Sequence, residues 1–169
     1  SHSQIELQQR IEQMVREHHA ELYRYAMRLC GLTADAEDIT QQVFLIAQTK
    51  ISQLRDESLE RNWLFTILRN TYFKLHRKQS PLPVSSLGVD LDHLPEDTDD
   101  VDIDTELLQL AINELPDDFK VTLLMFYFEG CSYKEIAAAL EIPHGTVMSR
   151  LSRAKQHLRT KLFPKMEKE

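Results

Sequence analysis

The residues best suited to a chemical task are basic and polar side chains near the C-terminal end of the chain. The segment 143–165 holds six basic residues and no acidic one. Lysine and arginine neutralise DNA phosphates, and arginine can also donate two hydrogen bonds to a guanine edge in the major groove. We therefore expect this segment to bind duplex DNA. Its candidate contact residues are Thr146, Ser149, Arg150, Ser152, Arg153 and Lys155.

The pattern around this segment predicts a helix-turn-helix. Ser132 and Glu135 have the spacing of a capping box at the start of a short helix, and residues 141–144 would form the turn. The core-facing residues expected for the two helices are Ile136, Ala137 and Leu140 in the first and Val147, Leu151, Ala154 and Leu158 in the second. This layout is typical of motifs whose second helix enters the major groove. An amphipathic hairpin with a solvated basic face is the alternative.

A second basic segment, 61–79, holds five basic residues and no acid, interleaved with aromatic residues. We expect a helix from about 59–63 to 78, with Trp63, Ile67, Thr71 and Leu75 on one face. Cations that follow a backbone beside rings that hold unstacked bases suit single-stranded nucleic acid. The candidate contact residues are Trp63, Arg69, Asn70, Phe73, Lys74 and Arg77. Core packing of the aromatic residues remains an alternative.

The charge distribution separates these two basic segments. The chain has 169 residues and a formal net charge of −7, yet segment 90–106 holds nine acids and no base. Residues 80–104 are also rich in proline and polar residues, which predicts a flexible acidic linker. Helical periodicity appears on both sides, and no useful alternation of the β type appears. Gly31 is expected to end one helix, Thr33 or Asp35 to cap the next, and Pro116 to stand in the first turn of a later one. We therefore predict an all-α fold with helical domains at 5–79 and 105–165, joined by the linker at 80–104.

Few features favour catalysis, a cofactor or a membrane. No run of 18 apolar residues exists, so we expect no membrane insertion. Cys30 and Cys131 are isolated, which is typical of small buried residues in a reducing cytoplasm. His18 and Glu21 lie three residues apart on an expected helix, a weak metal geometry without a second ligand pair. We therefore expect neither a metal nor a cofactor, and the hypothesis of a hydrolase built on these residues has little support.

Taken together, the motifs resemble the extracytoplasmic-function (ECF) sigma factors of bacterial RNA polymerase. The resemblance covers about residues 16–162. Segment 35–44 looks like region 2.2, 63–70 with Arg77 and Lys78 looks like regions 2.3 and 2.4, 115–120 looks like the start of region 4, and 132–154 looks like region 4.2. The four motifs occur in the family's order, with a linker in the expected place.

The resemblance implies a promoter-specificity subunit without catalytic activity. Region 2 would melt the −10 element and hold a flipped base in the loop 50–61, while the helix-turn-helix would read the −35 element. The implied partners are core RNA polymerase, contacted at the β′ clamp helices and the β flap, promoter DNA and an anti-sigma factor. The residues expected to dock on β′ are Asp35, Glu37, Asp38, Gln41 and Gln42.

Two points stay open at the level of the sequence. Gln42 stands where the family commonly has an acid, and phosphorylation of the neighbouring Thr40 would restore a negative charge there. The overall acidity also permits a sigma mimic that titrates an anti-sigma factor without reading DNA, although the two basic segments argue against it. Run-off transcription with core polymerase separates these two interpretations.

Overall fold

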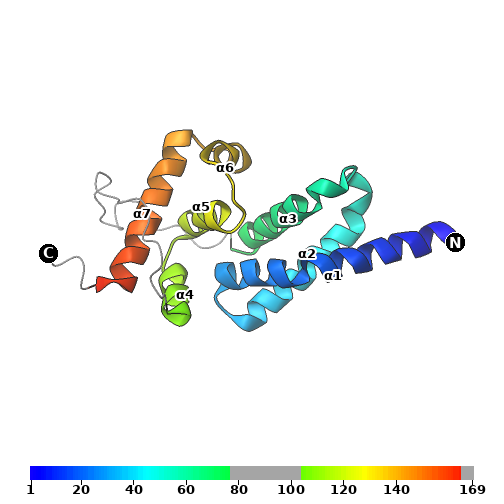
Figure 1. Ribbon diagram of the computed structural model, residues 1–169, viewed down its shortest axis with the longest axis horizontal. Coiled ribbons are helices and arrows are strands. Elements are labelled where there is room, and N and C mark those ends of the chain that lie inside the picture. The colour runs from blue at the N-terminus through cyan, green and yellow to red at the C-terminus, as the bar shows by residue number, and fades with distance from the viewer. Residues whose placement is uncertain (77–103, 165–169) are drawn as a thin grey trace. The chain divides into compact units, whose positions relative to one another are not determined.

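The computed structural model describes residues 1–76 and 104–164 (Figure 1). Within these ranges every regular element is a helix, so the predicted all-α class is confirmed. The chain divides into two compact units, 1–78 and 79–169, and each is described by itself. The acidic linker predicted at 80–104 lies outside the described residues except for Asp104. Among the described helices, none has the length and apolarity needed to cross a bilayer.

Unit 1 is a three-helix bundle in which α2 packs against both α1 and α3. Its elements are α1 (His2–Cys30), α2 (Thr33–Lys50), the short 3₁₀ helices η1 (Ile51–Gln53) and η2 (Glu57–Leu59), and α3 (Glu60–Leu75). Apolar residues at three- and four-residue spacing build the core, which explains why these segments are helical. The largest fully buried side chains of this unit are Tyr25, Tyr72, Phe65, Met14, Leu22, Leu29, Leu64 and Leu68.

The turn between α1 and α2 depends on the backbone freedom of Gly31. Gly31 adopts a φ of 77° and donates its N–H to the carbonyl of Met27 at 2.8 Å, so it ends α1 as the sequence predicts. The prediction that Thr33 or Asp35 caps α2 is wrong. Leu32 occupies the N-cap position, makes no side-chain cap bond and accepts the N–H of Ala36 through its carbonyl.

The segment between α2 and α3, expected to be a polar interval at 50–61, is more ordered than its composition suggests. Two turns of 3₁₀ helix form there, and Ile51 and Leu54 are buried against the bundle. The Asp56 carboxylate caps the second turn by accepting the Ser58 hydroxyl at 2.6 Å and the Ser58 N–H at 3.0 Å. These bonds lower the pKa of Asp56. The segment therefore has a defined conformation before any ligand binds.

Unit 2 is a four-helix arrangement in which the last helix packs against the other three (Figure 1). Its elements are α4 (Thr105–Asn113), α5 (Asp117–Tyr127), α6 (Tyr133–Leu140) and α7 (His144–Leu162). Pro116 is the N-cap of α5 and thus stands one residue before the first-turn position expected from the sequence. Its buried core includes Ala111, Ile112, Phe119, Val121, Leu123, Met125, Ile136, Val147, Leu151 and Ala154.

The predicted helix-turn-helix is formed by α6 and α7. Glu135 donates its N–H to the Ser132 hydroxyl at 3.1 Å, and Ser132 donates its N–H to the Glu135 carboxylate at 3.0 Å, which confirms the capping box. The bond from the Ser132 N–H also lowers the pKa of Glu135. Ile136 is buried, whereas Ala137 and Leu140 are only half-buried, and so is Leu158 of α7.

Two residues with positive φ shape the loops on either side of α6. Gly130 has a φ of 74°, and Glu141, which ends α6, has a φ of 55° and a ψ of 46°. For a residue with a Cβ, this left-handed conformation costs roughly 1–2 kcal/mol. Unit 2 therefore carries local backbone strain at Glu141, at the turn of the helix-turn-helix.

We expect Glu141→Gly to stabilise unit 2 by roughly 0.5–1 kcal/mol, because glycine adopts this conformation without a Cβ clash. Gly130→Ala should destabilise it by a similar amount, since a Cβ there meets nothing within 4 Å and only the backbone changes. Urea unfolding of the full chain, followed by far-ultraviolet circular dichroism, measures both. The fluorescence of Trp63, the single tryptophan, reports unit 1 and should not shift. Equal destabilisation by both variants would contradict the assignment of strain to Glu141.

Candidate nucleic-acid and polymerase interfaces

The outward face of α7 carries most of the residues predicted to contact duplex DNA. Val147, Leu151 and Ala154 bury one side of the helix, and the 100° turn per residue places another set on the opposite side. These residues are Thr146, Ser149, Ser152 and Arg153, all half-buried rather than fully exposed. The first turn of α7 contains no acidic residue. The first turn itself therefore adds no negative charge at the end of the helix that carries the positive dipole.

The remaining two residues predicted at this face lie on its flanks. Lys155 places its ammonium over the rings of Phe126 and Tyr127 of α5, with the Nζ atom 5.1 and 5.5 Å from the ring centres. This cation–π contact ties the middle of α7 to α5. Arg150 is half-buried on the other flank. A phosphate contact by either residue stays a prediction.

Helix α3 exposes only a narrow strip, and the strip differs from the predicted one. Asn70 and Lys74 are exposed, and Trp63 and Phe73 are half-buried. Trp63 lies two helical turns before Asn70 and therefore shares its face. Leu75, predicted on the same face as Trp63, is 65% exposed.

Arg69 does not lie on the exposed strip of α3, so its placement there is wrong. Its side chain is only 7% exposed, and its Nη2 atom donates to the Thr66 hydroxyl at 3.2 Å. A long side chain can bury its stem in a core while its head bonds to a neighbouring residue. Arg77, predicted beside it, lies outside the described residues.

Two polar residues of the same strip were missed at the level of the sequence. Asn62 and Thr66 are exposed, and Thr66 donates its hydroxyl to the Asn62 carbonyl at 3.0 Å. They precede Asn70 by eight and four residues, so helical spacing counted backwards from Asn70 would have found them. The strip thus combines amide and hydroxyl groups with one indole ring and one phenyl ring.

The residues predicted to dock on the polymerase are all exposed along α2. Glu37 and Gln41 line an open groove of about 420 Å³, whose other wall is formed by Ile11, Val15 and His19 of α1. Asp35, Asp38 and Gln42 lie on the side of α2 that does not line this groove. The helix therefore presents acidic groups on two adjoining surfaces.

Thr40 does not belong to either of these surfaces. It is 1% exposed, and its hydroxyl donates to the Ala36 carbonyl at 2.6 Å. A kinase needs a free hydroxyl, so the structure contradicts the hypothesis that phosphorylation of Thr40 compensates for Gln42. The hydroxyl instead satisfies its hydrogen bond within the helix.

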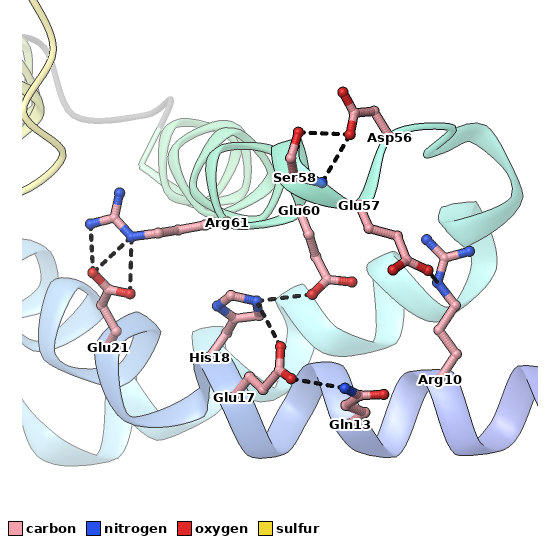
Figure 2. A network of polar contacts seen from close by, with 10 residues as sticks. All are labelled: Arg10, Gln13, Glu17, His18, Glu21, Asp56, Glu57, Ser58, Glu60 and Arg61. Carbon is pink, nitrogen blue, oxygen red and sulfur yellow. Dashed lines mark hydrogen bonds and ion pairs between the residues drawn. The ribbon is translucent and has the colours of Figure 1, made fainter.

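A network of charged side chains joins α1 to the start of α3 (Figure 2). The Nε2 atom of His18 lies 2.9 Å from the Glu60 carboxylate, and the Arg61 guanidinium donates from Nε to both oxygens of Glu21 at 2.9 and 3.1 Å. Arg10 faces Glu57 at 3.8 Å. The bonds from Arg61 lower the pKa of Glu21.

Potential metal ligands also occur in this network, although not in the combination considered from the sequence. Within the described ranges, Glu17, His18 and Glu60 offer ligand atoms that lie within 4.8 Å of one another. His18 approaches Glu60, not Glu21, and Glu21 is bonded to Arg61. A hydrogen bond accounts for the contact between His18 and Glu60. Cys30 and Cys131, expected to be buried, are half-buried, and neither forms a disulfide.

Comparison with known proteins places one sigma-70 region in each unit. The family model for Sigma-70 region 2 matches residues 14–81, and that for Sigma-70 region 4 matches residues 105–158. The solved structure of the sigma factor RpoE from Bartonella quintana, in complex with the anti-sigma factor NepR, has a TM-score of 0.66 and 27% identity. This match covers 89% of this chain and 95% of that chain. CnrH, solved with the cytosolic domain of CnrY, shares the fold with a TM-score of 0.62 and 21% identity, over 94% of this chain and 90% of that one.

Curated relatives narrow the class further. The ECF RNA polymerase sigma factor SigL of Mycobacterium tuberculosis is 35% identical over 151 residues, which are 86% of this chain and 85% of that protein. SigE of Mycolicibacterium smegmatis is 35% identical over 154 residues, which are 88% of this chain, and the chain spans 60% of the length of SigE. The chain therefore belongs to the ECF sigma factors of the sigma-70 family.

The lowered pKa of Glu21 predicts how the stability of unit 1 depends on pH. Glu21 stabilises the folded state above its ordinary pKa of 4.5, and this contribution is lost as the pH falls through the lowered value. The difference in urea midpoint between wild type and Glu21→Gln, followed by Trp63 fluorescence, should therefore shrink between about pH 7 and about pH 3. Glu12→Gln is the control, because exposed Glu12 bonds only to Gln8 of the same helix in the described contacts. A difference that does not change with pH would refute the assignment.

Proposed function

We propose that this chain directs core RNA polymerase to specific promoters and opens them, with no catalytic chemistry of its own. The observation that carries the proposal is the match of one sigma-70 region to each of two separate units, each of which presents a polar helix face suited to nucleic acid. One surface is the polar and aromatic strip of α3, and the other is the outward face of α7. Binding energy replaces covalent chemistry, because melting needs unpaired bases to be held rather than bonds to be broken.

The α3 strip suits unpaired −10 bases. Trp63 and Phe73 are half-buried, so each presents part of a ring while the remainder packs on the bundle. A ring held in this way can stack with a base, since every base has a π face. Asn70 and Thr66 add donors and acceptors for base edges, and Lys74 adds a positive charge for the backbone. Arg69 supports this strip from within the helix and is not a DNA contact in this proposal.

The α7 face suits the −35 duplex. Its short polar side chains, Ser149 and Ser152, allow the helix to approach base edges closely, and Arg153 has the reach and the planar donor fork for guanine. The capping box and the turn at Glu141 fix the helix relative to α6 before DNA arrives. Arg150 and Thr146 are suited to the flanking phosphates.

Docking on the polymerase is assigned to α2 through its exposed acids and amides, which complement a basic helical surface on β′. Unit 2 is expected to contact the β flap. The solved RpoE structure is a complex with the anti-sigma factor NepR, and we extend this type of partner to the present chain. These assignments place the protein at work in the cytoplasm. A sigma mimic is less well supported, because it would need neither the α3 strip nor the α7 face.

Run-off transcription tests the function directly. Core polymerase with this chain should transcribe from promoters selected out of random DNA, and core alone should not. Arg153→Ala should reduce discrimination at one −35 base pair by about 1–3 kcal/mol, measured from transcription on all four base pairs, whereas Arg150→Ala should weaken all templates about equally. No transcript from any selected promoter would favour the mimic. Uniform weakening by Arg153→Ala would remove its role in base reading.

Assignment of α2 to docking predicts weaker binding to core polymerase when its charge is removed. Asp38→Asn should weaken binding by roughly twofold to fivefold, because the residue is exposed and its ion pairs are screened. The anisotropy of fluorescently labelled sigma titrated with core polymerase measures this change, which should diminish at high salt. Glu6→Gln on α1 removes the same charge elsewhere and should bind like wild type. Equal affinity of Asp38→Asn and wild type would contradict the assignment.

A further inference from the structure

One face of α1 carries polar and charged residues that all pair with the short segment at the start of α3. From α1 come Arg10, His18 and Glu21, and from the facing segment come Glu57, Glu60 and Arg61 (Figure 2). In chain order, α1 offers two side chains with N–H donors and then a carboxylate, while the segment offers two carboxylates and then a guanidinium. All three pairs therefore match in one register only. A displacement of α3 that brought Glu60 to Glu21 would place two carboxylates together, which costs energy.

The strongest link in this set is the pair Glu21–Arg61. The guanidinium is held by both carboxylate oxygens, and its plane also lies over the Phe65 ring, with the Cζ atom 4.6 Å from the ring centre. Phe65 in turn packs on Tyr25 of α1, at 5.2 Å between ring centres. Arg61 is thus fixed by a bidentate bond and by a ring, and such a fork loses its geometry if either helix rotates.

His18 and Glu60 extend the same link toward η2. Both side chains are largely buried, with 18% and 12% exposed, so the bond between them is screened less than a surface pair. Glu60 is the first residue of α3, and Glu57 opens the turn before it. The two close pairs therefore hold the point at which the chain enters α3, and the longer contact of Arg10 with exposed Glu57 adds a weaker link. Helix α3 itself packs more extensively against α2 than against α1.

We propose that Arg10, His18 and Glu21 are positioning residues for promoter melting, although none of them touches DNA. By fixing residues 57–61 on α1, they set the rotation of α3 and thus the direction in which Trp63 and Asn70 face. The strip is then ordered before unpaired DNA arrives. The entropy cost of ordering these side chains therefore does not weaken binding of the melted bases. This inference rests on the proposed function and assigns a role in it to α1, which is not part of the proposed DNA-binding surface.

Charge exchange between Glu21 and Arg61 tests the proposal. The full chain with core polymerase is assayed on a duplex promoter and on the same promoter with an unpaired −10 region. Glu21→Arg and Arg61→Glu should each lower open-complex formation on the duplex by roughly tenfold. The loss on the unpaired template at saturating concentration should be much smaller, because binding there does not have to offset the free energy of melting. The double exchange should recover most of the duplex activity, because it restores an ion pair. Glu12→Arg is the matched control and should behave as wild type.

The outcomes are separable. Equal loss on both templates would mean that the bridges serve stability alone, and it would overturn the proposal, as would wild-type activity of the single variants. If the reversed side chains prevent folding, Glu21→Gln replaces them, and an unchanged ratio between the two templates then overturns the proposal. His18→Gln, which keeps a donor for Glu60, should retain more duplex activity than His18→Ala. A wild-type protein that transcribes neither template would instead refute the proposed function itself.

Discussion

In the proposed function, helix α3 has to serve a hydrophobic core and a nucleic acid at once, and this constraint governs unit 1. Seven of its residues are buried, and two of these, Arg69 and Thr71, are polar. The strip through Trp63, Thr66, Asn70 and Lys74 remains for a ligand. A small rotation of the helix would turn these side chains toward the core and bring core residues to the surface. The bundle must therefore hold α3 against rotation as well as against separation. Apolar packing resists separation well but discriminates rotations poorly, whereas paired charges are specific to one register.

The two surfaces are held by different means, in accordance with what each is proposed to read. In unit 2 the outward face of α7 is fixed locally, by the capping box of α6, by the turn at Glu141 and by the contact of Lys155 with α5. Duplex DNA presents a regular groove, and a rigid helix suits it. In unit 1 the strip is fixed by side chains that come from α1, about 40 residues away in sequence. Unpaired bases offer no preformed groove, so the order has to come from the protein.

The difference between local contacts in unit 2 and long-range contacts in unit 1 explains what could be predicted from the sequence. The capping box at Ser132, the stop at Gly31 and the buried spacing of Val147, Leu151 and Ala154 are local patterns, and the structure confirms them. The predicted exposure of Arg69 is wrong because a charged side chain can be buried when it bonds within its own helix, as Arg69 does to Thr66. The predicted cap of α2 is wrong because Leu32, which has no polar side chain, occupies the N-cap position. The bridges from α1 could not be predicted, because two residues so distant in sequence produce no periodic pattern that links them.

Charge acts locally in this protein, and its sum is a poor guide to its partners. The net charge of −7 is spread over a chain whose α7 face is basic and whose α2 surface is acidic. At physiological ionic strength the field of an exposed charge decays over about 8 Å, so each surface senses the groups beside it rather than the total. The proposed docking of an acidic α2 on a basic partner is therefore compatible with the proposed binding of phosphates by α3 and α7. Separation of these charges on different helices lets one small chain join a polymerase to DNA without either partner competing for the other's surface.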